Sequence, residues 1–246
     1  MSVTSVVKTV RVGVGSALSK LDPRESADHV SSLVLAQIFE TPYVATEGGS
    51  GAVPCLFESL KLESVDGLQY SAAVRPGIRF SEGTPLTADI AARALRSASV
   101  LAKRATVEVR GDRVWFTLAA RNPRFELTLA QSGCSLVLDK GLQFHGTGPF
   151  MFEQRPNLRL LQNATSIRLV RNPQFQGHAL VDEVEFVVLP ADADGTPRKM
   201  MDGSRLFSLG WRPQVDMQTG VQLAYADFLS RFGKEGPDSK SVGEQL

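Results

Sequence analysis

Apolar and polar residues alternate in two short segments on either side of Asp66-Gly67. The first segment covers residues 60–64 and the second covers residues 68–72. Strict alternation is typical of a strand with one buried face, and Asp-Gly is typical of the tight turn between two such strands. The pattern therefore predicts a β-hairpin. Residues 106–118 repeat it around a Gly-Asp turn and predict a second hairpin.

Helical periodicity follows the first hairpin. Thr87 can cap a helix, because apolar residues recur after it at spacings of three and four. Residues 30–39 carry a second apolar stripe, and Ser26 or Asp28 can cap that helix. A short helix is expected over residues 123–130, with proline in its first turn.

A strand is predicted near the start of the chain, at residues 6–14. The acidic residues between 182 and 185 are interpreted as solvated charges on a strand edge. The glycine-rich segment 44–52 lacks the Gly-Lys-Ser/Thr signature of a phosphate-binding loop, so a flexible connector is expected there.

Composition adds bounds to this pattern. The 246 residues are 43% hydrophobic and 22% charged, which fits one large globular domain or two small ones. A formal charge of +1 gives no electrostatic reason to expect a nucleic acid or an anionic membrane as partner. No apolar run approaches bilayer length, and the first residues show no signal-peptide pattern. We expect a cytoplasmic protein, or a periplasmic or extracellular one if an export signal has been removed.

Candidate chemistry is sparse. Cys55 and Cys134 are the only cysteines; one disulfide is possible, but two buried thiols are the more frequent outcome. His29, His145 and His178 show no metal-binding spacing, and no nucleophile motif is present. We therefore expect that the protein is not an enzyme and has no catalytic residue, metal site or cofactor.

The segment from residue 54 to 89 resembles a known family. Its order of residues is similar to that of the peptide/nickel (dipeptide- and oligopeptide-binding) family of extracellular solute-binding proteins of ABC importers. The matching positions are Pro54, Glu58-Ser59, Asp66-Gly67, Tyr70, Arg75, Gly77, Phe80, Gly83 and Pro85-Leu86-Thr87-Ala88-Asp89.

Other motifs extend the resemblance over residues 7 to 195. Leu21-Asp22-Pro23 follows the first strand, and residues 35–40 match the family segment at the end of the following helix. Gly146-Thr147-Gly148-Pro149-Phe150 is the most recognisable pentapeptide, and residues 181–190 match a family strand. The glycines of the pentapeptide are expected to allow positive φ and a close chain crossing.

The resemblance implies an α/β fold (an α+β mixed sheet), as a single lobe of a periplasmic-binding-protein-like type II fold. Proteins of this family are about twice as long and enclose peptide between two lobes. We expect residues 1–232 to form the lobe and residues 233–246 a disordered tail. Residues 201–216 resemble either the crossover into the second lobe or the later strand that returns to the first; the return, followed by a helix from 221 to 232, is slightly preferred.

Six residues are candidate ligand contacts. Ser16 and Ser19 lie in the family segment that lines the cleft, and Trp211 would offer an indole to a ligand, although core packing explains it equally well. The aspartate of the family's return loop, which pairs with a peptide's amino terminus, corresponds to Asp216 at a longer spacing. Tyr43 and His145 complete the set.

The function implied is a non-enzymatic module that binds a peptide or other small molecule. A single lobe would leave one side of its ligand exposed to water. A second copy of the chain or a protein partner could cover that open side. The alternative is a protein-interaction or scaffold module that uses the exposed face between the former lobes.

Overall fold

The computed structural model describes residues 7–26, 28–141, 143–189, 219–220, 222–223 and 225–227. The chain divides into two units, Met1–Asp194 and Gly195–Leu246, and every labelled strand and helix belongs to the first. In the second unit, the described residues are helical, which agrees with the helix predicted from residue 221. The predicted return strand and the tail from residue 233 lie outside the described residues.

One antiparallel sheet is built from the two predicted hairpins. Its order is β4-β5-β7-β6. The strands are β4 (Lys61–Leu62), β5 (Gln69–Ala73), β6 (Ala105–Arg110) and β7 (Arg113–Leu118). Gly67 and Gly111 occupy the turns with φ of 73° and 63°, a region that a residue without a side chain enters at little cost. Both hairpins are thus confirmed.

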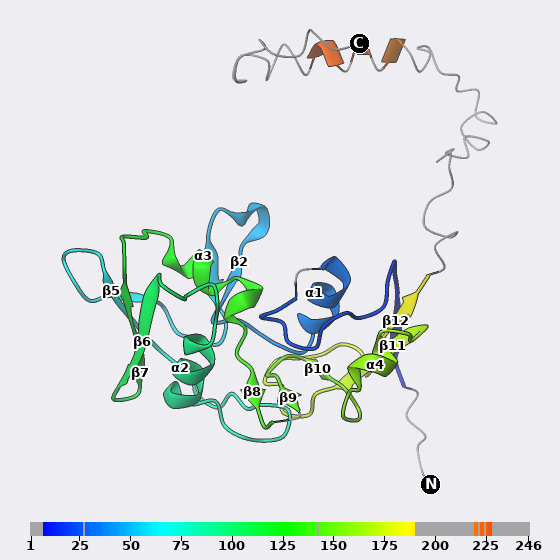
Figure 1. Ribbon diagram of the computed structural model, residues 1–246, viewed down its shortest axis with the longest axis horizontal. Coiled ribbons are helices and arrows are strands. Elements are labelled where there is room, and N and C mark those ends of the chain that lie inside the picture. Colours follow the sequence, from blue (N-terminus) through cyan, green and yellow to red (C-terminus); the bar gives the residue numbers. More distant parts are fainter. Residues whose placement is uncertain are drawn as a thin grey trace. The chain divides into compact units, whose positions relative to one another are not determined.

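Two helices pack on this sheet: α2 (Ala88–Arg96) and α3 (Phe125–Leu129). The Thr87 hydroxyl caps α2 by accepting a hydrogen bond of 3.3 Å from the Ile90 amide, as predicted. Figure 1 shows α2 beside β6 and β7. The core that results is centred on three fully buried rings, those of Phe57, Phe80 and Phe116; we refer to it as the first core.

A second sheet has the order β1-β12-β11-β10. Its strands are β1 (Thr9–Val14), β10 (Phe150–Met151), β11 (Ser166–Arg171) and β12 (Glu183–Val188). β1 and β12 run parallel and the other pairs run antiparallel. With α1 (His29–Leu35) this sheet encloses the second core, which includes Leu35, Leu169 and Phe186. Asp28, one of the two predicted caps, accepts a hydrogen bond from the Ser31 amide at the start of α1.

The expectation that the acidic residues of β12 are solvated charges on a strand edge is wrong. β12 lies between β1 and β11, so its side chains have neighbours on both sides. Glu185 forms an ion pair of 2.8 Å with Arg11, and Glu183 is paired with Arg168. The sheet order, which the sequence of one strand does not reveal, places arginines opposite these carboxylates.

The glycine-rich segment is also corrected, because it is an ordered hairpin and not a flexible connector. Its strands are β2 (Tyr43–Ala45) and β3 (Ala52–Pro54), joined by the short helical turn η1 (Glu47–Gly49). The Thr46 side chain closes the turn by bonding both the amide and the carbonyl of Gly51. The remaining small elements are η2 (Ser132–Cys134), β8 (Leu138–Asp139), β9 (Phe144–His145) and α4 (Leu158–Leu161).

The chain crosses itself closely where residues 146–150 pass the segment after α1. The amide of Gly148 donates to the carbonyl of Ile38 at 2.9 Å, and that of Phe150 donates to Gln37 at 3.0 Å. A Cβ atom on Gly146 would lie 1.9 Å from the Ile38 oxygen. The predicted close crossing is confirmed. The predicted positive φ is wrong for Gly146 and Gly148. Glycine is required at both positions because a Cβ atom would collide with the backbone of the segment after α1.

Candidate functional site

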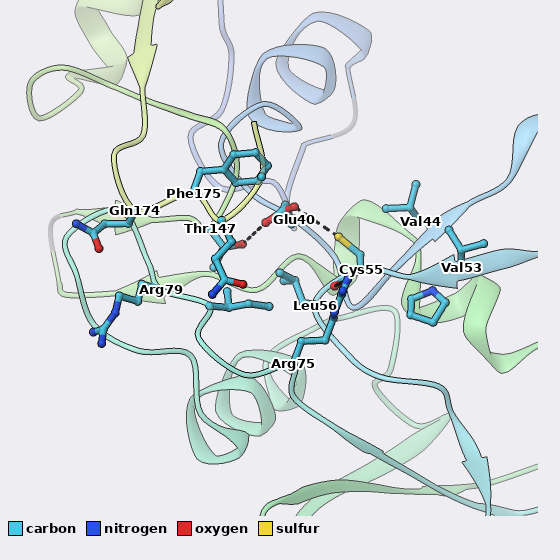
Figure 2. A pocket seen from close by; sticks show the side chains of 14 residues that line it. Glu40, Val44, Val53, Cys55, Leu56, Arg75, Arg79, Thr147, Gln174 and Phe175 are labelled. Carbon is cyan, nitrogen blue, oxygen red and sulfur yellow. Dashed lines mark hydrogen bonds between the residues drawn. The ribbon is translucent and has the colours of Figure 1, made fainter. Parts of the chain in front are cut away.

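A hollow of about 400 Å³ lies beside this crossing, at the border of the two cores. Ligand pockets typically have volumes of roughly 300 to 1,000 Å³. We refer to this one as the Glu40 hollow, and Figure 2 shows its lining side chains. It is lined by Glu40, Val44, Val53, Pro54, Cys55, Leu56, Arg75, Ile78, Arg79, Thr147, Gln174, Phe175, Gln176 and Gly177.

The carboxylate of Glu40 is held by two donors from distant parts of the chain. The Thr147 hydroxyl donates to Oε2 at 2.8 Å, and the Cys55 thiol donates to Oε1 at 3.5 Å (Figure 2). Burial raises the pKa of Glu40, while the two hydrogen bonds and the charge of Arg75 act in the opposite direction. Glu40 therefore fixes the geometry of the hollow wall and retains unused lone pairs.

The surroundings of the thiol beside it disfavour the thiolate, which is the nucleophilic form. Burial, together with the nearby Glu40 carboxylate, raises the pKa of Cys55 to about 12. Burial raises the pKa of Cys134 to about 12 as well, and its thiol donates to the Thr128 carbonyl at 3.4 Å. Both cysteines are free, as expected, but only Cys134 is buried; Cys55 is half-buried, so the expectation of two buried thiols holds for one of them.

Two arginines bring positive charge to the hollow. Arg75 donates to the carbonyl of Cys55 at 3.2 Å, and Arg79 donates to the carbonyl of Gly83 at 2.9 Å. Neither guanidinium is in an ion pair with an acidic group of the described residues. Each keeps free N–H donors, which suit a carboxylate or another anionic group.

The rest of the lining combines apolar walls with two free amides. Val44 and Val53 face each other across the β2–β3 hairpin and are 48% and 50% exposed. The side-chain amides of Gln174 and Gln176 make no hydrogen bond within the described part of the chain. Apolar surface with a few free polar groups is the usual make-up of a small-molecule site.

A second hollow of about 490 Å³ adjoins the first. The two share Glu40, Val44, Cys55 and Phe175. Its other wall carries the hydroxyl groups of Ser32, Ser132 and Ser135. An extended ligand could therefore occupy both sides of Glu40.

Ser16 and Ser19 lie on the exposed loop after β1. The Ser19 hydroxyl donates to Asp28 at 2.5 Å, and its amide donates to the Ser31 hydroxyl at 3.0 Å. Ser19 thus reinforces the cap of α1. Neither serine lines the two hollows.

Tyr43 and His145 are not among the residues that line the two hollows. Tyr43 is only 2% exposed in the first core, and its hydroxyl donates to the Glu58 carbonyl at 2.5 Å. Burial raises the pKa of Tyr43 and lowers that of His145, whose Nδ1 lies 3.3 Å from the Ser81 hydroxyl. Trp211 and Asp216 lie outside the described residues, so their roles stay predictions.

Sequence reasoning missed Glu40, Arg75 and Thr147 as site residues, although all three stand in the segments that carry the family resemblance. Glu40 and Thr147 are separated by 107 positions. Their proximity results from the chain crossing, and no local sequence pattern indicates it.

In the described residues, no group of three or more His, Cys, Asp or Glu side chains could hold a metal ion. No helix found there has the length and apolar character to cross a bilayer.

Curated proteins match only a short segment of this chain. A GDP-L-fucose synthase from Sinorhizobium fredii is 46% identical over 37 residues, which is 15% of this chain and 12% of that protein. GDP-L-fucose synthase 1 from Arabidopsis thaliana is 53% identical over 36 residues, which is 11% of its length. Segments of this length show no shared activity.

Solved structures match the fold over most of this chain. The pheromone receptor PrgZ, described with its mode of peptide binding, superposes with a TM-score of 0.67 at 18% identity, over 83% of this chain and 46% of that one. A periplasmic oligopeptide-binding protein from Borrelia burgdorferi gives 0.66 at 18% identity, over 76% and 44%. Peptide-bound OppA from Listeria monocytogenes gives 0.63 at 15% identity, over 75% and 43%. This chain thus spans less than half the length of these structures, and the likeness is one of fold.

The expected fold class is confirmed by these superpositions and by the sheets, one of which is antiparallel and the other mixed. The chain covers less than half of each matched structure, which fits a single lobe of a periplasmic-binding-protein-like fold. A family model for solute-binding proteins matches residues 51–216, more than half of the chain. The chain therefore belongs to the bacterial extracellular solute-binding proteins, family 5 (middle).

Proposed function

We propose that this protein is a non-enzymatic module that binds a peptide or other small molecule in the Glu40 hollow. The observation that carries the proposal is the pair Arg75 and Arg79, which line the hollow and form no ion pair within the described residues. Membership in a solute-binding family supports it.

The lining suits the parts of a short peptide. The two guanidinium groups can pair with a terminal carboxylate, and the glutamine amides can donate to and accept from peptide bonds. The exposed valine pair of the β2–β3 hairpin offers an apolar wall for a side chain. The protonated Cys55 thiol is occupied in holding Glu40, which supports binding over covalent chemistry.

The same valine pair bears on the alternative of a scaffold protein. Val44 and Val53 line the Glu40 hollow, so a bound small molecule would cover part of their surface. This observation favours the binding module. A second copy or a protein partner would complete the enclosure of a ligand that one lobe leaves partly in water.

Isothermal titration calorimetry with trialanine, its C-terminal amide and its N-acetyl derivative tests the proposal. The arginines should recognise the carboxylate, so the amide should bind about tenfold or more weakly, as expected for the loss of a charge-assisted hydrogen bond of about 1.5 to 3 kcal/mol. Blocking the amino terminus should have the smaller effect.

Arg75→Gln should weaken trialanine binding by about tenfold or more on the same grounds. Arg93→Gln is the matched control, because Arg93 is an exposed arginine of α2 outside the hollow. Equal binding by both variants, or no heat of binding with any of the three peptides, would contradict the proposed site.

A further inference from the structure

A separate hollow of about 370 Å³ lies where the β6–β7 hairpin meets α3. It shares no residue with the Glu40 hollow or its neighbour. We refer to it as the basic hollow. It is lined by Lys103, Arg104, Leu118, Ala119, Ala120, Arg121, Asn122, Phe125 and Thr128.

Every charged residue in this lining is cationic. Lys103, Arg104 and Arg121 are exposed, and none of them is in an ion pair with an acidic group of the described chain. Elsewhere in the first unit, arginines such as Arg24 and Arg168 have a carboxylate partner. The Asp66 carboxylate acts on Arg121 through its charge but forms no ion pair with it. The three cations repel one another, and a bound anion relieves that repulsion.

One of the cations is anchored in place. The Nε atom of Arg121 donates to the backbone carbonyl of Asp66 at the turn between β4 and β5. The nearby Asp66 carboxylate is itself engaged by the Ser64 hydroxyl and the Leu68 amide. The terminal nitrogens of Arg121 therefore remain available to a ligand.

The floor of the basic hollow is apolar and rigid. Leu118 and Phe125 are 5% and 2% exposed. The Phe125 ring packs edge-on against Phe116 with centroids 5.2 Å apart, and it lies 5.7 Å from the Tyr70 ring. The exposed Ala119 and Ala120 extend the apolar surface toward the rim.

Lys103 has an unusual backbone that supports a role for its side chain. Its φ of 61° makes it the one residue other than glycine with positive φ in the described chain. This conformation costs a residue with a side chain roughly 1 kcal/mol, and glycine is the residue that relieves the cost. A lysine at this turn sets a cation at the rim of the hollow at some expense of stability.

We propose that the basic hollow binds an amphipathic organic anion, a carboxylate that carries an acyl or aromatic group. The carboxylate pairs with the guanidinium and ammonium groups at the rim, and the apolar part lies on Leu118 and Phe125. A small inorganic anion would satisfy only the rim, and a neutral apolar compound only the floor.

Calorimetry on the full 246-residue chain tests this with three probes: octanoate, acetate and octylamine. Octanoate should bind, and acetate and octylamine should each bind at least tenfold more weakly, because one lacks the apolar group and the other reverses the charge. Octylamine or acetate binding as tightly as octanoate would overturn the proposal, and so would the absence of octanoate binding.

A pair of double variants locates the site. Lys103→Gln with Arg104→Gln should weaken octanoate binding by tenfold or more. The control, Arg93→Gln with Arg159→Gln, removes the same charge from exposed positions outside all three hollows and should leave octanoate binding unchanged. All four side chains are exposed, so both variants should keep the fold. An equal loss in both variants would show that octanoate responds only to net charge and would refute a site in the basic hollow.

Discussion

The two cores of this protein are assembled in different ways. The sheet of the first core joins hairpins whose strands are neighbours in sequence, β4 with β5 and β6 with β7. The sheet of the second core pairs β1 with β12, and the bonded residues Arg11 and Glu185 are 174 positions apart. Closing such a long loop costs more chain entropy than closing a hairpin, and chains dominated by contacts of high sequence separation fold more slowly.

The two modes of assembly explain why the Glu40 hollow depends on segments from distant parts of the chain. The Glu40 hollow lies at the border of the two cores, with Thr147 and the crossing glycines supplied by the segment that leads into β10. A first core folded alone would hold Cys55 and Arg75, but it would lack Thr147, one of the two donors that hold Glu40. The site is therefore a property of both cores together.

The largest expected effect comes from deleting one ring in each core. Phe116→Ala and Phe186→Ala should each lower the free energy of unfolding by about 3 to 5 kcal/mol, because both rings are almost fully buried. Urea denaturation measures the loss. Hydrogen exchange then sharpens the comparison: Phe186→Ala should expose the amides of β1 and β12 while those of β5 and β7 stay protected.

The reverse pattern is expected for Phe116→Ala, which should expose β5, β6 and β7 first. If Phe186→Ala removed protection from both sheets to the same extent, the two cores would be one cooperative unit and the comparison would fail.

The next effect comes from the crossing that joins the cores. Gly146→Ala should destabilise the protein by about 3 kcal/mol, because the new Cβ would lie 1.9 Å from the backbone oxygen of Ile38. Gly51→Ala is the control: its nearest neighbour is 3.9 Å away and its φ is ordinary, so its effect should stay within about 0.5 kcal/mol. Equal midpoints of urea unfolding for the two variants would show that the crossing tolerates a side chain.

A smaller effect is expected from the titration of Glu40. Burial holds its pKa in the folded state above the ordinary value of 4.5, so the folded protein binds more protons than the unfolded chain between these two values. Glu40 therefore makes the free energy of unfolding fall as pH rises through this window. Glu40→Gln should remove this contribution, and the stability of the variant relative to the wild type should increase with pH. A constant difference from pH 4 to 8 would contradict the assignment.

The smallest effect belongs to the basic hollow in the first core. Lys103→Gly should stabilise the protein by about 0.5 to 1 kcal/mol, because glycine adopts the φ of 61° without strain. Thermal unfolding measures the gain, and Arg104→Gly at the neighbouring position should show no such gain. A destabilising Lys103→Gly would mean that the lysine contributes to the fold and not only to the rim.

The local elements are predictable from the sequence and their neighbours in space are not. Thr87 as a cap and Gly67 in a turn act through residues within a few positions, so periodicity and turn chemistry locate them. The pairing of β1 with β12 and the position of Glu183 inside a sheet depend on chain closure, which no local pattern records. The order of motifs that resembles the solute-binding family supplies what the pattern lacks.

The candidate site illustrates the same limit. Tyr43 is a candidate ligand contact on sequence grounds, yet its place in the first core depends on the carbonyl of Glu58, 15 positions away. Glu40 stands out in the sequence only as part of a motif. Its role depends on Thr147 and Cys55, which are distant from it along the chain and reach it only in the folded protein.

Native mass spectrometry of the full chain purified from its own host tests the central claim most directly, with Arg75→Gln measured beside the wild type. The account predicts a small molecule or peptide retained by the wild type at one per chain, or at one per subunit of a dimer, and lost from the variant. A folded wild-type protein that carries no such ligand, or a variant that retains it equally, would contradict the Glu40 hollow as the binding site.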